Sequence, residues 1–214
     1  MSYDGNTVIG VQQLDDNNEP RLDGFHRTFE YDTQGKLVRI DEYIGEDLTR
    51  YFLFEYSTDQ IIQKEHFIPG DDDEESVDYT VTYTLNSNEK VIKLDHESWN
   101  LSEPFSQSYE YENGNVIKIT TTSESSASNS VQELEFDEYL NPNSLTGFEL
   151  GLGDNIFSSS TQNKNNVIKS TLIRSGMSPI VNTYTYTYNS NRFPVERFIN
   201  GAAVAEWFYD FECK

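Results

Sequence analysis

Residues that could do chemistry are few and scattered in this sequence. The histidines His26, His66 and His96 lie in three different segments, and none forms the H-E-x-x-H motif that binds zinc from one helix face. At His96 the second histidine of that motif is replaced by Asn100. The single cysteine, Cys213, has no second cysteine with which to form a disulfide bond. We therefore predict no metal centre and no catalytic residue, and expect hydrogen-bonded histidines at strand ends.

One acidic run is a candidate for binding an ion. Asp71, Asp72 and Asp73 precede two glutamates, and clustered carboxylate oxygens are the ligands that calcium prefers. The run lacks the alternating aspartates and the sixth-position glycine of an EF-hand loop. We favour a solvated hairpin loop whose charge discourages aggregation of sheet edges, with calcium binding as the alternative.

Motifs for nucleophilic and phosphate chemistry are missing from the sequence. There is no G-x-S-x-G nucleophile elbow, and the glycines of Gly151-Leu152-Gly153 lack the third glycine of a dinucleotide-binding loop. With 37 acidic residues, a carboxylate pair for glycoside hydrolysis gives no usable signal. We predict that the protein is not an enzyme and needs no cofactor, with a hydrolase of carbohydrate or peptide as the remaining enzyme hypothesis.

The sequence is organised around a repeated hairpin pattern. In residues 109–119, YEYENGNVIKI, tyrosines alternate with glutamates, which is typical of a strand with one apolar and one solvated face. Asn113-Gly114 predicts a tight turn because both residues tolerate positive φ. The β-branched residues that follow suit a returning strand. Variants of this unit recur at 3–11, 29–40, 54–64, 81–94, 134–142 with 165–170, and 186–197.

These repeats predict an all-β fold. We expect an antiparallel up-and-down meander of about fourteen strands in a single domain, residues 1–214. Aromatic residues at every second position of the first strands should share one face. Because long sheets twist, we expect the meander to roll into a half-barrel or a barrel. The predicted strands are 7–14, 25–31 with 37–44, 49–56 with 61–68, 77–85 with 90–98, 106–112 with 115–123, 131–138 with 164–173, 181–189, 194–199 and 203–211.

An irregular insertion interrupts the repeats at about residues 143–163. Leu145, Phe148 and Leu152 have helical spacing over a short stretch. We predict a short helix or compact loop packed inside the rolled sheet, either as a plug or as the lid of a pocket. If the aromatic face binds a ligand, the rings expected to contact it are Phe54, Tyr83, Tyr111, Phe148 and Tyr186.

Composition limits the partners and the location. The net charge of −22, from 15 basic and 37 acidic residues, argues against binding nucleic acid and against docking on anionic lipid heads. No apolar run reaches the roughly eighteen residues that a membrane-spanning helix needs. The first residues also lack the basic region and apolar core of a signal peptide. We expect a mature exported chain, in the periplasm or at the cell surface, with a cytoplasmic protein as the alternative.

The hairpin pattern resembles the YD repeats of RHS-type proteins, most closely in residues 29–40 and 109–119. The whole chain is similar to a domain of unknown function found in secreted proteins and lipoproteins of Gram-negative gut-type bacteria. That domain has a turn like residues 136–142 and a short return strand like residues 165–168. This chain departs from it by lacking a lipobox and some turn glycines. The resemblance implies an antiparallel β architecture and an envelope or exported location, and it implies no activity.

The sequence as a whole favours a non-catalytic protein of the cell envelope or the secreted fraction that acts as a binding or structural module. The first alternative is a carrier that holds an apolar or acyl ligand against the aromatic face, with residues 143–163 as its lid. The second alternative is the hydrolase named above. An apolar small molecule or another envelope protein is the partner that we expect.

Overall fold

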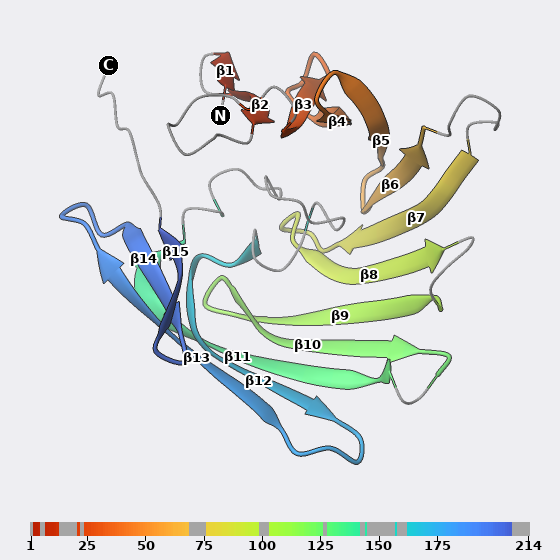
Figure 1. Cartoon of the computed structure of the whole chain (residues 1–214). Helices are drawn as coiled ribbons and strands as arrows, with labels where there is room; N and C mark the ends of the chain where they lie inside the picture. The colour runs from red at the N-terminus through yellow and green to blue at the C-terminus, as the bar shows by residue number, and fades with distance from the viewer. Residues whose placement is uncertain are drawn as a thin grey trace. The chain divides into compact units, whose positions relative to one another are not determined.

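The computed structural model describes residues 2–4, 7–12, 21, 24–68, 76–98, 103–125, 128–141, 144, 157 and 162–206. In this part of the chain all fifteen regular elements are β-strands (Figure 1). The chain divides into two compact units, Met1–Phe105 and Ser106–Lys214. The all-β antiparallel meander predicted from the sequence is confirmed, whereas the single domain over residues 1–214 stays a prediction.

In unit 1 each strand is hydrogen-bonded to the next one along the chain, and the described pairs are antiparallel. The predicted hairpin of residues 25–31 and 37–44 is found with the same bounds. The strands are β1 (Ser2–Asp4), β2 (Thr7–Gln12), β3 (Phe25–Tyr31), β4 (Leu37–Ile44), β5 (Asp47–Tyr56), β6 (Gln60–Phe67), β7 (Ser76–Leu85) and β8 (Val91–Ser98).

The core of unit 1 lies on one face of this sheet. Ile40 lies opposite Phe29 on one side and Phe52 on the other, and all three side chains are buried. Alternation along β5 buries Phe52 and leaves Glu55 exposed, as the period-two pattern predicts. Tyr51 is an exception, because it belongs to the opposite face and is nevertheless buried.

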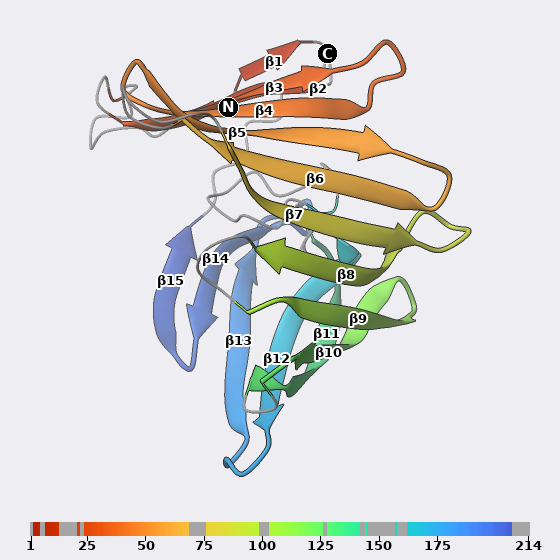
Figure 2. The same cartoon turned by 90° about the vertical axis from the view of Figure 1, so that its right-hand side faces the viewer.

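In unit 2 each strand is likewise hydrogen-bonded to the next one along the chain (Figure 2). Asn113 and Gly114 have φ of 52° and 84°, which confirms the predicted tight turn between its first two strands. The predicted pairing of 131–138 with 164–173 is also confirmed. The strands are β9 (Phe105–Glu112), β10 (Asn115–Ser123), β11 (Ser130–Leu140), β12 (Asn165–Arg174), β13 (Ile180–Tyr188), β14 (Pro194–Ile199) and β15 (Ala202–Glu206).

Several predictions concern residues outside the described part of the chain. Most of the insertion at 143–163 is among them, including Phe148, so its predicted helix and its role as plug or lid stay predictions. The calcium candidates Asp71, Asp72 and Asp73 lie outside the described residues as well, and so does Cys213.

A side-chain oxygen closes the turn of three hairpins. Asp32 Oδ1 accepts hydrogen bonds from the backbone N–H of Gln34 at 2.8 Å and of Lys36 at 2.9 Å. Asn86 and Asn189 make the corresponding bonds to residues two and four positions later, at distances between 2.9 and 3.0 Å. An acceptor on a short side chain is therefore what these turns share, because it satisfies two backbone donors that the strands leave unpaired.

The fourth residue of this turn has positive φ, which predicts a stabilising substitution. It is Gly35 in the first turn, with φ of 79°, but Glu89 in the second, with φ of 58°. Glu89→Gly should raise the free energy of unfolding by about 0.5–1 kcal/mol, because glycine adopts this conformation without a Cβ clash. Gly35→Ala should lower it by about 1 kcal/mol. Urea unfolding of the two variants measures both effects, and a less stable Glu89→Gly variant would contradict the assignment of strain to this position.

Candidate functional site

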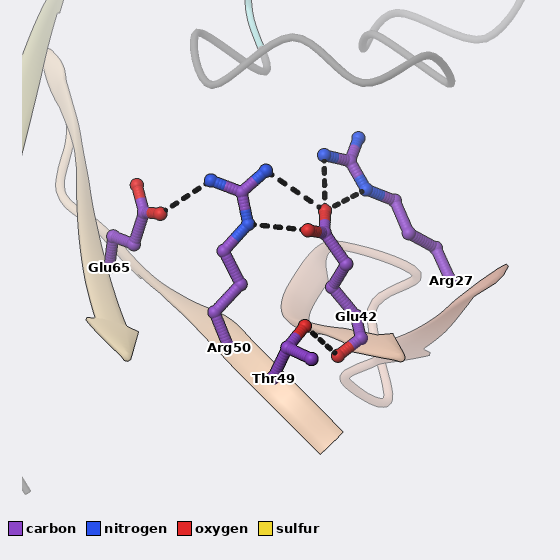
Figure 3. A network of polar contacts seen from close by, with 5 residues as sticks. All are labelled: Arg27, Glu42, Thr49, Arg50 and Glu65. Atoms are coloured by element: carbon purple, nitrogen blue, oxygen red, sulfur yellow. Dashed lines mark hydrogen bonds and ion pairs between the residues drawn. The ribbon is translucent and has the colours of Figure 1, made fainter. Parts of the chain in front are cut away.

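Four charged side chains cross unit 1 in a row (Figure 3). They are Arg27 of β3, Glu42 of β4, Arg50 of β5 and Glu65 of β6, and together they form the charge ladder. The side chains of Arg27 and Glu65 are 0% exposed. Because positive and negative residues alternate, the four side chains have no net formal charge. This is the strongest convergence of titratable groups in the described part of unit 1.

Strand register brings the members of the charge ladder together. Arg27 lies directly opposite Glu42, and Glu42 lies directly opposite Arg50. Glu65 lies opposite Phe52, two residues beyond Arg50, so that it meets the guanidinium diagonally. Since residues two apart on a strand share a face, Arg27 and Arg50 lie on the same face as the buried rings.

The contacts within the charge ladder are short and centred on Glu42. Arg27 donates to Glu42 Oε2 from Nε at 2.9 Å and from Nη2 at 2.8 Å. Arg50 donates from Nε to Glu42 Oε1 at 2.6 Å and from Nη2 to Oε2 at 3.1 Å. Arg50 Nη1 donates to Glu65 Oε1 at 2.7 Å. Glu42 therefore accepts hydrogen bonds from both guanidinium groups, and Arg50 binds it in the bidentate geometry that arginine favours.

Aromatic rings lie against both guanidinium groups. The Phe52 ring centroid is 5.6 Å from Arg27 Cζ and 5.2 Å from Arg50 Cζ. Phe25 lies 5.4 Å from Arg27 Cζ, and Phe67 lies 5.8 Å from Arg50 Cζ. Cation–π attraction gains strength where water is excluded. The rings thus attract both guanidinium cations on a largely buried face.

The electrostatics of the charge ladder favour its ion pairs. Burial lowers the pKa of Arg50, but hydrogen bonds to Glu42 and the attraction of Glu65 outweigh it and leave this pKa above its usual range. Both carboxylate oxygens of Glu42 and Oε1 of Glu65 accept these guanidinium bonds. The arrangement is suited to fixing the register of four strands, because a one-residue slip would separate every pair.

Two of the predicted ligand-binding rings lie close together in the core of unit 1. Phe54 and Tyr83 are both buried. Gln63 lies opposite Phe54, and its Oε1 accepts a hydrogen bond from the Tyr83 hydroxyl at 2.8 Å. These rings therefore belong to the packed interior of unit 1, and their role in ligand binding stays a prediction.

The other described candidates lie in unit 2, on strands that are separated by three others in the sheet order. Tyr111 of β9 and Tyr186 of β13 are half-buried. The Tyr186 hydroxyl donates to the carbonyl oxygen of Val167 at 2.9 Å. Binding of a ligand by these two rings stays a prediction as well.

The three histidines contact rings of neighbouring strands rather than one another. Among the described residues, no group of three His, Cys, Asp or Glu side chains could hold a metal ion. The ring pairs, with their centroid separations, are His26 with Tyr43 at 4.6 Å, His66 with Tyr51 at 4.6 Å, His96 with Tyr79 at 4.8 Å and His96 with Phe105 at 4.7 Å.

Sequence reasoning missed a group of four asparagines in unit 2, of which all but Asn165 are buried. The group, called the asparagine clip below, consists of Asn115, Asn141, Asn163 and Asn165. Asn163 Oδ1 accepts the backbone N–H of Val116 at 2.7 Å, and its carbonyl accepts from Asn141 Nδ2 at 3.0 Å. Asn115 and Asn165 exchange two hydrogen bonds, at 2.8 and 3.0 Å. The asparagine clip fastens the start of β12 to the start of β10, where the chain returns from the insertion.

Asp137 organises the neighbouring strand bulges. It accepts hydrogen bonds from the backbone N–H of Tyr139 at 3.0 Å and of Asn166 at 3.1 Å, and one from the Tyr188 hydroxyl. Burial and the bond to Asp137 both raise the pKa of Tyr188 above its ordinary value. The register of β11 and β12 shifts on both sides of Phe136, so Asp137 binds the backbone where regular pairing is interrupted.

Buried tyrosines predict a loss of stability at alkaline pH. Burial raises the pKa of Tyr109 above its ordinary value of 10.0 and that of Tyr186 to about 12. A tyrosine with a raised folded pKa contributes its full stability below pH 10 and loses it as the pH rises through the folded pKa. The free energy of unfolding should therefore fall between pH 10 and pH 12.

Urea unfolding across that pH range tests this expectation. Tyr109→Phe keeps a buried ring and removes one ionisation, so its stability should decline less steeply than that of the wild type. Both proteins are compared with their own stability near pH 8, where tyrosine is protonated. A free energy of unfolding that stayed constant up to pH 12 would be inconsistent with these buried phenols.

Comparison with known proteins gives structural similarity only. No protein-family model and no curated protein matches the sequence. Among solved structures, the chain is similar to a porin-like protein from Bacteroides uniformis ATCC 8492, with a TM-score of 0.41 and 11% sequence identity over 85% of this chain and 86% of that one. It is also similar to a porin-like protein from Bacteroides vulgatus ATCC 8482, with a TM-score of 0.40 and 14% identity over 80% of this chain and 86% of that one.

Proposed function

We propose that this protein is a non-catalytic binding or structural module of the cell envelope or the secreted fraction. The observation that supports the proposal is the charge ladder. Its carboxylates accept hydrogen bonds from the guanidinium groups beside them, and its guanidinium groups lie against aromatic rings. These contacts join neighbouring strands, and they therefore stabilise the sheet as a scaffold.

The location forms part of the same proposal. It rests on the resemblance of the hairpin repeats to a domain of secreted proteins and lipoproteins. The net charge of −22 suits a soluble module that does not bind nucleic acid. No helix in the described part of the chain is long and apolar enough to cross a membrane.

Assay of a panel of fluorogenic glycosides and peptides tests the non-catalytic part of the proposal. We expect no turnover above buffer, and the same result from a sample held above its melting temperature. Turnover that disappears when the protein unfolds would overturn the proposal and favour the hydrolase hypothesis. The comparison with unfolded protein is the control, because a contaminating enzyme need not lose its activity at that temperature.

Titration with a fluorescent fatty acid separates a module from a carrier. The predicted carrier would hold an acyl chain against rings such as Phe54 and Tyr83, which are buried among their neighbours in unit 1. A module with a packed face should show no saturable binding of the probe. Saturable binding that Tyr83→Ala abolishes and Glu55→Gln, an exposed substitution, leaves unchanged would favour the carrier.

A further inference from the structure

The end of the β12–β13 hairpin exposes large aliphatic side chains. Ile173 is 37% exposed, Met177 63%, Ile180 51% and Val181 47%, and these four residues are called the apolar tip. The other residues from Arg174 to Pro179 are exposed too. The hairpin end projects from unit 2 in both views (Figures 1 and 2). Four exposed aliphatic residues grouped at one hairpin end differ from the scattered single residues that are normal on a protein surface, and such a group marks an interaction surface.

The aliphatic residues lie on both faces of the hairpin. Leu172 lies opposite Ile180, and Thr171 lies opposite Val181. Since successive residues of a strand point to opposite faces, Ile180 and Val181 face in opposite directions. A folded protein partner would dock on one of these faces and leave the other exposed. Acyl chains of a fluid lipid layer can surround the hairpin end, and they would cover both faces at once.

A cation at the apolar tip complements lipid phosphate. Residues 155–195 contain no acidic residue, although the chain has 37. Of the four basic residues in this stretch, Arg174 lies at the tip, Lys169 pairs with Glu135 at 2.6 Å, and Lys164 and Arg192 stand at the other end of β12 and β13. Arg174 is exposed at the end of β12, beside Ile173. A guanidinium in this place can bind a lipid phosphate while the aliphatic side chains enter the layer below it.

Part of the backbone at the hairpin end is already paired. Ile173 and Arg174 pair with Val131 and Ser130 of β11, and Leu172 pairs with Ile180 across the hairpin. The turn has a hydrogen bond from the Met177 N–H to the Arg174 carbonyl at 3.2 Å. These pairs reduce the free-energy cost of entering a membrane interface, whereas the outer edge of β13 pairs with β14 from Tyr184 onward.

We propose that the apolar tip inserts into the surface layer of a phospholipid bilayer, with Arg174 at the level of the lipid phosphates. The insertion anchors unit 2 reversibly, as small apolar surfaces do at membrane interfaces. Because the whole chain has a net charge of −22, anionic lipid repels the rest of the molecule, and uncharged phosphatidylcholine is the appropriate probe. The inference does not rest on the proposed function.

Flotation with phosphatidylcholine vesicles tests this proposal on the full chain. The wild type should float with the vesicles, and the triple variant Met177→Ser, Ile180→Thr, Val181→Thr should bind at least about ten-fold more weakly, because three exposed aliphatic side chains no longer enter the lipid. Threonine keeps the β-branched shape that suits a strand. Ile44→Thr is the matched control, since Ile44 is 57% exposed in unit 1, and it should float like the wild type. Arg174→Gln should show intermediate binding.

Each alternative result overturns the proposal. Wild-type protein that does not float, or a triple variant that floats equally well, removes the apolar tip as an anchor. Equal loss in Ile44→Thr would indicate general adhesion of exposed aliphatic residues. Sedimentation velocity without vesicles covers the remaining case: if the wild type self-associates and the triple variant is monomeric, while neither floats, the tip binds a second copy of the chain and not lipid. Circular dichroism confirms that each variant is folded.

Discussion

Replacing Glu42 with glutamine is expected to lower the free energy of unfolding by about 3–5 kcal/mol, the usual effect of removing one partner of a buried ion pair. The glutamine amide retains one acceptor oxygen, where Glu42 used both oxygens to bind Arg27 and Arg50. Two guanidinium groups then remain on the buried face with only Glu65 as a counter-charge in the ladder. Urea unfolding followed by circular dichroism measures the change. Since small domains are stable by about 5–15 kcal/mol, the loss is a large part of the total.

Glu55→Gln is the matched control for this substitution. Glu55 makes an ion pair with Lys64, but its side chain is 58% exposed. Exposed pairs contribute about 0–1 kcal/mol, so the control should unfold close to the wild type. Equal effects of the two substitutions would mean that solvent reaches the charge ladder and that burial does not set its contribution.

Replacing Asn163 with alanine is expected to lower the free energy of unfolding by about 2–3 kcal/mol, because the substitution leaves a buried backbone donor without its partner. The Val116 N–H now donates to Asn163 Oδ1 at 2.7 Å, and both residues are buried. Alanine retains the carbonyl that accepts from Asn141, so the loss is confined to the side-chain bond. Thermal unfolding of the wild type and of Asn163→Ala, followed by calorimetry, measures this change in the free energy of unfolding.

Asn191→Ala is the control for the asparagine clip, since Asn191 is an exposed turn residue of the same unit. It should change the free energy of unfolding by less than about 0.5 kcal/mol. Limited proteolysis adds a local readout, because the clip joins β12 to β10 where the chain returns from the insertion. Asn163→Ala should speed cleavage within residues 142–161, and an unchanged cleavage rate would contradict the role of the clip as the anchor of that return.

The hairpins were predictable because their signals are local. Asn113-Gly114 determines its turn through two backbone conformations, and the alternation of Phe52 and Phe54 with Glu55 assigns the faces of β5. In the turn at Asn86, by contrast, a glutamate stands at the positive-φ position. The hydrogen bonds that Asn86 Oδ1 accepts from the backbone N–H of Asn88 and Lys90 compensate for the missing glycine, so a search for Gly underestimates how often this turn recurs.

The charge ladder was within reach of the same reasoning but was missed. Arg27 stands two residues from Phe25 and from Phe29, so period two already places it on the aromatic face. Its charge argued for solvent, and only the partner Glu42 on the next strand makes burial possible. Partners on different strands depend on register, which the composition of one strand does not reveal.

The asparagine clip could not be predicted from local pattern. Asn115 and Asn165 are 50 residues apart in the chain, and the whole insertion, residues 143–163, lies between them in the sequence. Asparagine is typical of loops, and nothing in the residues around Asn163 distinguishes a buried acceptor from a solvated one. Long-range polar contacts of this kind form only once the fold has brought the residues together, so the local sequence does not predict them.

The stability of a fully apolar ladder tests most directly whether these charges serve the scaffold. The variant combines Arg27→Met, Glu42→Leu, Arg50→Met and Glu65→Leu. If the four side chains only pair with one another, removing all of them leaves no buried charge unpaired, and the free energy of unfolding should return to within about 1 kcal/mol of the wild type or exceed it. A variant that is as unstable as Glu42→Gln would contradict the account, since the four charges would then stabilise unit 1 through contacts other than those with one another.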